Sequence, residues 1–330
     1  MTNQDGIQEP GLYINPMTDY GFKRIFGDEC VTAAFLNDLL KPKPKIDKVI
    51  FLNKEEQAEN EDNKGVVYDI RCELEDGSEI IIEMQNREQV YFRDRIVYYL
   101  SRSITPQGYK GRIDNPDRQN KEGKSIKEAW NFKLKPVYGV FFLNFNLDGL
   151  KPCMVRTVQL KVNETDEEFN NKVRAYTIEL PLIKGKRPED CKDEIEYWIY
   201  NIYNLENMTT ALPFQTQQPA FARMGELANF ANMSFEQQQS YMRSLDTYRT
   251  VVAAEEFTFN KGREEGRAEG RAEGEAIGLV KGEAIGLEKG RAEGEYAKSM
   301  EHAKKMKAKG FSLQEIAEIT ELKIEEIEKL

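Results

Sequence analysis

The sequence is short of the side chain that most hydrolases use for acid–base chemistry. It contains one histidine, His302, which lies in a glycine-rich, charged segment near the end of the chain. A main body without histidine excludes Ser-His-Asp and Cys-His catalysis, His-ligated zinc and most His-based nuclease sites there. Any chemistry in the main body must therefore use carboxylates, amides, Lys, Arg, Tyr or a metal ion.

Cysteines and long apolar runs are also scarce. The four cysteines are scattered without a CxxC pair, as expected for reduced thiols in a cytosolic protein. No run approaches the roughly 18 apolar residues that span a bilayer. Residues 1–13 lack the basic start and apolar run of a secretory signal. We therefore expect a cytoplasmic protein without a membrane segment.

Negative charge dominates, but it is unevenly distributed. The formal net charge is −10, which does not favour a protein that coats nucleic acid over its whole surface. Residues 91–135 are the exception, with 11 Lys and Arg against 5 Asp and Glu. This segment is the candidate for contact with a polyanion.

The order of local patterns predicts an α/β core of about 130 residues. Helical patterns cover 19–26, ended by Gly27, and 29–40, capped by Asp28 and stopped by the prolines of KPKPK. A strand at 46–53 follows, then an acidic loop, a hairpin near 68–85 and a helix at roughly 89–104. Residues 105–125 are expected to be a polar loop, and the apolar run 137–145 a central strand.

The remainder predicts an extension and a tail. We expect four segments: a core at 1–150, strands and helices that complete or extend it at 151–258, a Gly/Glu/Arg-rich segment at 259–298, and a two-helix tail at 299–330. Glycine recurs at every fourth residue from 262 to 294, which is compatible with a marginal helix, a charged linker or a closely packed oligomer helix. The tail is therefore a possible site of homo-oligomerisation.

The hairpin has a register that its loop determines. A three-residue loop, Glu75-Asp76-Gly77, places its glycine in the left-handed region and pairs Leu74 with Ser78. Counting back places Asp69 opposite Glu83. One face then carries Tyr68, Ile70, Cys72, Leu74, Ile80, Ile82 and Met84, and the other carries Val67, Asp69, Arg71, Glu73, Glu79, Ile81, Glu83 and Gln85.

This register brings Asp69, Glu83 and Gln85 together. Directly opposite side chains lie about 5 Å apart at Cβ, so the two carboxylates repel each other unless a cation lies between them. Mg²⁺ accepts such oxygen ligands together with water and substrate phosphate. The alternative is a polar outer sheet face on which Arg71 neutralises Asp69.

Four segments, in this order, resemble one family. One pattern resembles the PD-(D/E)XK nuclease signature: Asp69 is followed, after a gap of 13 residues, by Glu83-Met84-Gln85. The chain is more closely similar to the PD-(D/E)XK family transposases, the recombination-promoting nucleases called Rpn. Their "D..FK..FG" and "R..YY.S" segments match DYGFKRIFG at 19–27 and RIVYYLS at 95–101, and their glycine-rich charged tail recurs here as well. Two departures are Tyr68 in place of proline and Gln85 where the wider superfamily has lysine.

The resemblance implies a restriction-endonuclease-like fold, with a central mixed sheet flanked by helices, a C-terminal α+β extension and a helical tail. It also implies a metal-dependent DNA endonuclease acting in recombination or in mobile-element or phage conflict. Asp69 and Glu83 would hold Mg²⁺ or Mn²⁺, aided by a backbone carbonyl near Met84, and Gln85 would orient the attacking water by hydrogen bonds.

Other residues have two interpretations each. Asp19 is either a further acidic ligand or only a helix N-cap. Arg95 and Arg102, seven residues apart on one helix, either bind the DNA backbone or are ordinary surface residues. Tyr98 and Tyr99 are either core or base-stacking groups.

The function has alternatives too. The chain could be a catalytically weak or inactive nuclease fold that binds DNA or a protein partner, with self-association through its tail. It could also be a transposase that performs strand transfer, which the sequence does not distinguish from simple cleavage.

Overall fold

The computed structural model describes residues 11–53, 55–56, 66–109, 112–119, 125–129 and 132–330. The chain forms two compact units, Met1–Thr250 and Val251–Leu330. Within the described parts of the chain, every helix is too short or too polar to cross a membrane. The four cysteines are free thiols.

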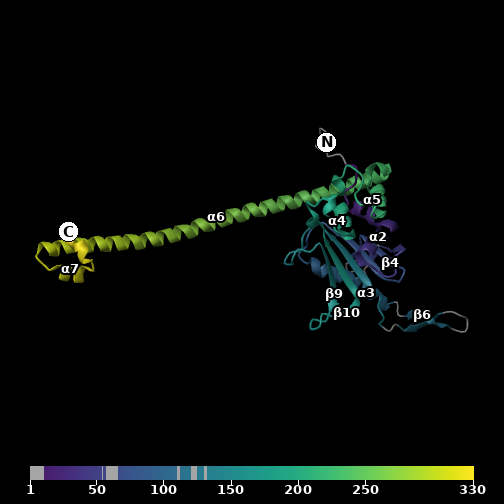
Figure 1. The fold of residues 1–330 in the computed structure, drawn as a ribbon, viewed down its shortest axis with the longest axis horizontal. Helices are drawn as coiled ribbons and strands as arrows, with labels where there is room; N and C mark the ends of the chain where they lie inside the picture. Colours follow the sequence, from purple (N-terminus) through teal and green to yellow (C-terminus); the bar gives the residue numbers. More distant parts are fainter. Residues whose placement is uncertain (1–10, 54, 57–65, 110–111, 120–124, 130–131) are drawn as a thin grey trace. The chain divides into compact units, whose positions relative to one another are not determined.

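A mixed six-stranded sheet is the centre of the first unit (Figure 1). In spatial order its strands are β1 (Val49–Phe51), β4 (Ile70–Leu74), β5 (Glu79–Gln85), β8 (Val137–Leu143), β10 (Glu168–Glu179) and β9 (Val155–Lys161). β5 and β10 run parallel to β8, whereas β1, β4 and β9 pair antiparallel with their neighbours. The predicted mixed sheet and its central strand near 137–145 are confirmed.

The first face of the sheet is covered by four helices. They are α1 (Asp19–Phe26), α2 (Glu29–Leu40), α4 (Glu194–Asn204) and α5 (Ala220–Ala228). Phe142 of β8 is at the centre of this layer, because its ring lies 5.6 Å from Phe22, 5.1 Å from Phe26 and 5.2 Å from Phe35 between centroids. All four rings are almost fully buried. Each buries 150–250 Å², so these contacts fix α1 and α2 on the sheet.

The second face is covered by α3 (Phe92–Tyr109). Its apolar side chains pack on Tyr68, Ile81 and Phe141 from the sheet. Gly139 of β8 permits this approach, since a Cβ there would lie 2.6 Å from the Phe141 ring and 3.1 Å from Leu100 of α3. The two faces thus have separate hydrophobic cores, each with its own helices.

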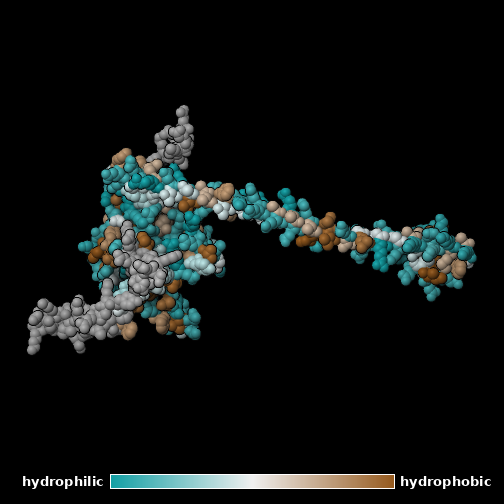
Figure 2. Space-filling view, turned by 180° about the vertical axis from the view of Figure 1, so that it is seen from behind, coloured by the Kyte–Doolittle hydropathy of each residue, from teal (hydrophilic) through white to brown (hydrophobic). Residues whose placement is uncertain are grey.

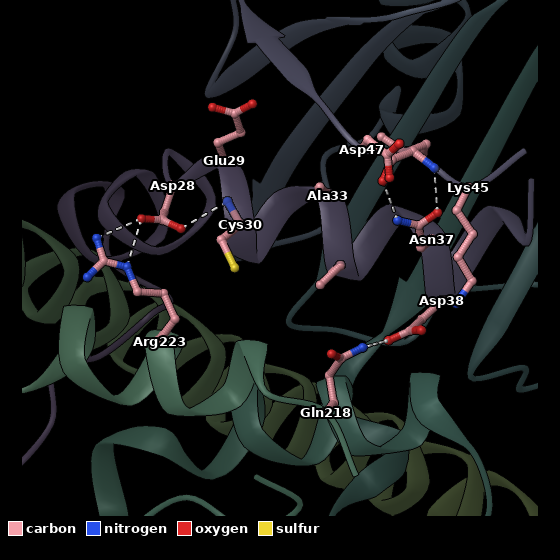
Figure 3. A pocket seen from close by; sticks show the side chains of 12 residues that line it. Asp28, Glu29, Cys30, Ala33, Asn37, Asp38, Lys45, Asp47, Gln218 and Arg223 are labelled. Carbon is pink, nitrogen blue, oxygen red and sulfur yellow. Dashed lines mark hydrogen bonds and ion pairs between the residues drawn. The ribbon is translucent and has the colours of Figure 1, made fainter. Parts of the chain in front are cut away.

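The helix ends at α1 and α2 follow the predicted signals. Gly27 is the C-cap of α1, and Asp28 caps α2 by accepting hydrogen bonds from the N–H groups of Cys30 and Val31. Asp28 also forms an ion pair with Arg223 of α5, 2.9 Å away, at one end of an open pocket between these helices (Figure 3). At the other end, Asp38 accepts hydrogen bonds from Trp198 and Gln218. These acids therefore join helices to one another.

The predicted polar loop at 105–125 was wrong for the described residues; 110–111 and 120–124 lie outside them. α3 continues to Tyr109, although Pro106 lies inside its last turn, and the Thr105 hydroxyl donates to the carbonyl of Ser101 in the turn before. β6 (Arg112–Gln119) then pairs with β7 (Ser125–Ala129), with a register shift around Pro116. Strand pairing uses backbone groups, which polar residues also carry, so polarity alone does not exclude a hairpin. Most of the predicted acidic loop lies outside the described residues; its first two residues form β2 (Glu55–Glu56), paired with β3 (Val66–Val67).

The remaining elements extend this core. Short 3₁₀ helices lie at Leu180–Ile183, Pro188–Asp190, Leu205–Asn207 and Phe230–Asn232. β9 and β10 belong to the main sheet, although they lie in the predicted extension at 151–258. The four-segment subdivision itself stays a prediction.

The glycine repeat is helical. It lies within α6 (Phe235–Ala308), whose side chains are exposed throughout the repeat. Figure 2 shows mostly hydrophilic side chains along this helix, interrupted by hydrophobic ones. Exposed hydrophobic side chains of the repeat include Ile277, Leu279 and Leu287. In the second unit, α7 (Leu313–Thr320) and α8 (Ile324–Glu328) pack on the end of α6 around Ala303, Ile316 and Ile327. The two short tail helices are thus confirmed, and oligomerisation through them stays a prediction.

Replacing Gly77 with alanine is expected to destabilise the first unit. Gly77 has φ +76°, and a non-glycine residue in the left-handed region costs roughly 1–2 kcal/mol. An added Cβ would meet the flexible end of the Lys135 side chain, which can move aside, so the backbone cost dominates. Urea unfolding should show this loss for Gly77→Ala and a smaller loss for Gly77→Asn, because asparagine tolerates this conformation. Equal stability of wild type and Gly77→Ala would contradict the proposed role of the turn.

Candidate active site

The hairpin between β4 and β5 has the predicted register. Leu74 N–H donates to the carbonyl of Ser78 at 2.8 Å, closing the loop over Gly77. The pairs run back from Glu73↔Glu79 to Ile70↔Ile82. One further step along the strands brings Asp69 beside Glu83.

The two acids are bonded to each other's strands. Glu83 Oε1 accepts a hydrogen bond from the backbone N–H of Asp69 at 3.0 Å, and Asp69 Oδ2 accepts one from the N–H of Met84 at 3.0 Å. Hydrogen bonds to charged groups contribute about 1.5–3 kcal/mol each. This reciprocal pair of bonds holds both carboxylates at one place on the sheet, as the register predicted.

Tyr68 does not lie on the face that strict alternation predicts. It packs with Ile81 and Tyr99 on the α3 side, whereas Ile70 and Cys72 lie on the other side. The chain bends at Asp69, and β4 begins only at Ile70. Because the backbone leaves the regular strand there, the two-residue alternation does not extend through Asp69. The predicted face of Tyr68 was therefore wrong.

Burial makes the acid pair costly in its ionised form. Glu83 is 2% exposed, and the Asp69 side chain is 22% exposed. Burial, followed by the charge of Asp69, raises the pKa of Glu83 to about 8. Burial also raises the pKa of Asp69, although the Met84 hydrogen bond and the charge of Lys23 act against this. The pair therefore has an affinity for a proton or for another cation.

Arg71 has a different role from the one considered for it. Its Nε donates to Glu79 Oε1 at 2.6 Å, and its guanidinium lies over the Tyr68 ring. The cation beside Asp69 is Lys23 of α1, whose Nζ is 3.7 Å from Asp69 Oδ1. The interpretation of this face as a polar surface neutralised by Arg71 is therefore not supported.

Gln85 joins the acid pair to α3. Its Nε2 donates to Glu83 Oε2 at 3.3 Å, and its Oε1 accepts from Arg95 at 3.2 Å. Arg95 in turn donates to the Tyr99 hydroxyl at 2.6 Å and lies over the Tyr99 ring. Because arginine can only donate, it fixes which end of the Gln85 amide faces Glu83. Gln85 therefore presents N–H groups, not its carbonyl, towards the acids.

Asp19 is not the N-cap of α1. Thr18 occupies that position, and its hydroxyl accepts a hydrogen bond from Gly21 N–H. Asp19 is the first helical residue, and its carboxylate lies 2.5 Å from Lys23 Nζ. The predicted cap was off by one residue because threonine and aspartate are both good capping residues.

The two tyrosines of α3 differ from each other. Tyr99 is buried against Tyr68, which agrees with the core interpretation, whereas Tyr98 is 46% exposed. Arg102 is partly buried on the same helix. The predicted contacts of Arg95 and Arg102 with DNA stay predictions.

The acid pair fits a hard divalent cation. Each carboxylate binds a backbone N–H through one oxygen, and its other oxygen, Asp69 Oδ1 or Glu83 Oε2, faces polar side chains. Among the described residues, no cluster of three His, Cys, Asp or Glu side chains could hold a metal. Mg²⁺ needs only one or two carboxylates when water and substrate phosphate complete its shell. The donor set is therefore compatible with Mg²⁺ or Mn²⁺.

Two features of the site were not predicted from the sequence. They are the place of Lys23 beside Asp69 and the hydrogen bond between Arg95 and Gln85. The i,i+4 spacing of Asp19 and Lys23 signals their ion pair. Contacts between residues as far apart as Lys23 and Asp69 depend on how α1 packs on the sheet, which no local pattern contains.

The metal-free protein is expected to lose stability as the pH rises. The folded-state pKa of Glu83 is raised from 4.5 to about 8, so folding favours the protonated form. The stability that protonated Glu83 contributes is then fully present below the unfolded pKa and is lost as the pH rises from about 4.5 to about 8. Unfolding in EDTA across this range should show the decline, and Glu83→Gln should flatten it. A pH profile identical in both proteins would contradict it.

Comparison of the chain with known proteins identifies a family. A family model described as "PD-(D/E)XK nuclease family transposase" matches residues 16–254, which include the whole acid-pair hairpin, α1 and α3. No curated protein and no solved structure was found to match. The matched segment is most of the chain, and the mixed sheet with flanking helices is consistent with a PD-(D/E)XK fold. The chain belongs to the PD-(D/E)XK nuclease family transposases.

Proposed function

We propose that this protein is a Mg²⁺- or Mn²⁺-dependent DNA endonuclease of the Rpn type that acts in recombination or in mobile-element or phage conflict. The observation that carries the proposal is the pair of reciprocal hydrogen bonds of Asp69 and Glu83, which holds a half-buried and a buried carboxylate together. Burial of two mutually repelling acids destabilises the fold unless they hold a cation. Such an arrangement is typical of a site selected for binding and not for stability.

The side chains have distinct roles in the proposed hydrolysis. Asp69 and Glu83 would hold the divalent ion, which would supply Lewis acidity to lower the pKa of bound water and to stabilise charge on the phosphate. Gln85 orients the attacking water through an amide N–H that Arg95 keeps turned towards the acids. The basic segment 91–135 begins on α3 beside this site and favours a polyanionic substrate.

Removing either acid is expected to abolish cleavage. Supercoiled plasmid should be nicked by wild type with Mg²⁺ and not with EDTA. Asp69→Asn and Glu83→Gln should lower the rate by about two orders of magnitude or more, because the cation loses a ligand. Plasmid binding in Ca²⁺ serves as the control and should be retained.

The outcomes separate the candidate functions. Wild type that binds plasmid but never cleaves it would support an inactive binding module. Joined products from a reaction with a second DNA would indicate strand transfer. Equal nicking by wild type and both variants would contradict the assigned site.

Arg95 and Arg102 should respond differently to substitution by lysine. Arg95 holds Gln85 and Tyr99 with two guanidinium nitrogens, which an ammonium cannot reproduce. Arg95→Lys should therefore lower kcat about tenfold with little change in DNA affinity. Arg102→Lys is the matched control on the same helix and should leave kcat unchanged.

A DNA-backbone role for Arg95 has a different signature. Weaker binding of Arg95→Ala, with a salt dependence reduced by about one charge and an unchanged kcat, would show that Arg95 contacts DNA and does not position Gln85.

A further inference from the structure

Strand β5 brings no positive charge to the acid pair. Its third motif position is Gln85, whose amide is neutral and whose carbonyl oxygen is already bonded to Arg95. Hydrolysis of a phosphodiester adds negative charge to the attacking water and to the phosphate as the transition state forms. An amide can orient these groups but cannot neutralise them. Any positive charge beyond that of the divalent ion must therefore come from another element.

Lys23 of α1 lies beside the acid pair, where such a charge would act. Its Nζ lies 3.7 Å from Asp69 Oδ1, the oxygen that is not bonded to backbone. The side chain is 26% exposed, so it is partly shielded from solvent and still open to a substrate. A lysine side chain carries a positive charge at neutral pH, and this one lies beside two carboxylates, Asp19 and Asp69.

Three sets of contacts determine the position of Lys23. Phe22 and Phe26 hold α1 on the sheet through Phe142. Asn86, the residue after Gln85, donates to the carbonyl of Met17 at 2.7 Å and so ties the start of α1 to the end of β5. Asp19, one turn before Lys23, holds the ammonium from its outer side. These contacts fix α1 on the sheet, with its start tied to the end of β5.

We propose that Lys23 supplies, from α1, the catalytic ammonium that the third position of the strand motif lacks; this rests on the proposed nuclease function. In the reaction the water oxygen bonds to phosphorus as the bond from phosphorus to the leaving sugar oxygen breaks. The water proton passes to solvent, and the leaving oxygen takes up a proton. Lys23 stays protonated throughout and stabilises the negative charge that develops beside Asp69. Asp19 then orients the ammonium and is not a metal ligand.

The test compares Lys23→Met, Lys23→Arg and Lys305→Met in the full chain. Lys305 forms a similar i,i+4 ion pair with Glu301 in the second unit, so its variant controls for the loss of one positive charge. Lys23→Met should lower kcat for Mg²⁺-dependent nicking about a hundredfold, the effect of removing one charge-stabilising donor, with KM changed little. Lys23→Arg should restore part of kcat, and Lys305→Met should behave as wild type.

A second readout needs no cleavage. Mn²⁺ binding to DNA-free protein, followed by water-proton relaxation, should become about tenfold tighter in Lys23→Met, because a cation beside Asp69 has been removed. A lysine that only supported the fold would give weaker or unchanged Mn²⁺ binding. The opposite directions of the two effects, slower cleavage with tighter metal binding, identify the proposed role.

The outcomes are distinguishable. If wild type does not cleave, the nuclease function itself fails. If wild type cleaves and Lys23→Met keeps its kcat, or binds Mn²⁺ no more tightly, only the role of Lys23 is overturned. Thermal unfolding of each variant in EDTA shows whether a lost activity comes from a lost fold. If Lys23→Met does not fold, the kcat of Lys23→Arg, which keeps the positive charge, is the deciding measurement.

Discussion

The site depends on the two hydrogen bonds that Asp69 and Glu83 exchange with each other's strands. Because each carboxylate is bonded to the opposite backbone, the acids cannot move apart to relieve their repulsion without breaking the hairpin. The repulsion and the burial therefore appear as raised pKa values and not as displaced side chains. A divalent cation relieves both costs at once, which couples metal binding to the stability of the hairpin.

The hydrophobic architecture brings two cations to this pair from opposite faces of the sheet. α1 belongs to the core around Phe142 on one face, and α3 belongs to the core around Phe141 on the other. Lys23 therefore approaches Asp69 from the first layer, while Arg95 approaches Glu83 through Gln85 from the second. Since both helices are fixed by buried rings, the positions of the two charges are set by packing. Substitutions in either core are able to affect the site without touching it.

The sequence was sufficient to predict those parts of the site whose geometry depends on neighbouring residues in the chain. A three-residue loop ending in Gly77 determined the register, and the register determined that Asp69 and Glu83 share a side. The sequence was insufficient to predict the face of Tyr68, because a side-chain contact interrupts the regular alternation of the strand. The bend at Asp69, whose N–H donates to Glu83, moves Tyr68 to the other face. It was also insufficient for Lys23, since the contact with Asp69 exists only after the Phe22 and Phe26 rings have packed.

Gln85 and Lys23 are best understood as parts of one charge balance. When the acids are ionised, the site holds three negative charges, on Asp19, Asp69 and Glu83. Lys23 and Arg95 supply two positive charges. The net charge is then −1, and binding of a divalent ion changes it to +1. A lysine at position 85 would add a third positive charge beside the Arg95 guanidinium, whose Nη1 now lies 3.2 Å from the Gln85 carbonyl oxygen. An ammonium and a guanidinium placed side by side repel each other strongly in a buried site. A neutral amide at this position is therefore the residue that lets Arg95 approach Glu83 while the ammonium comes from α1.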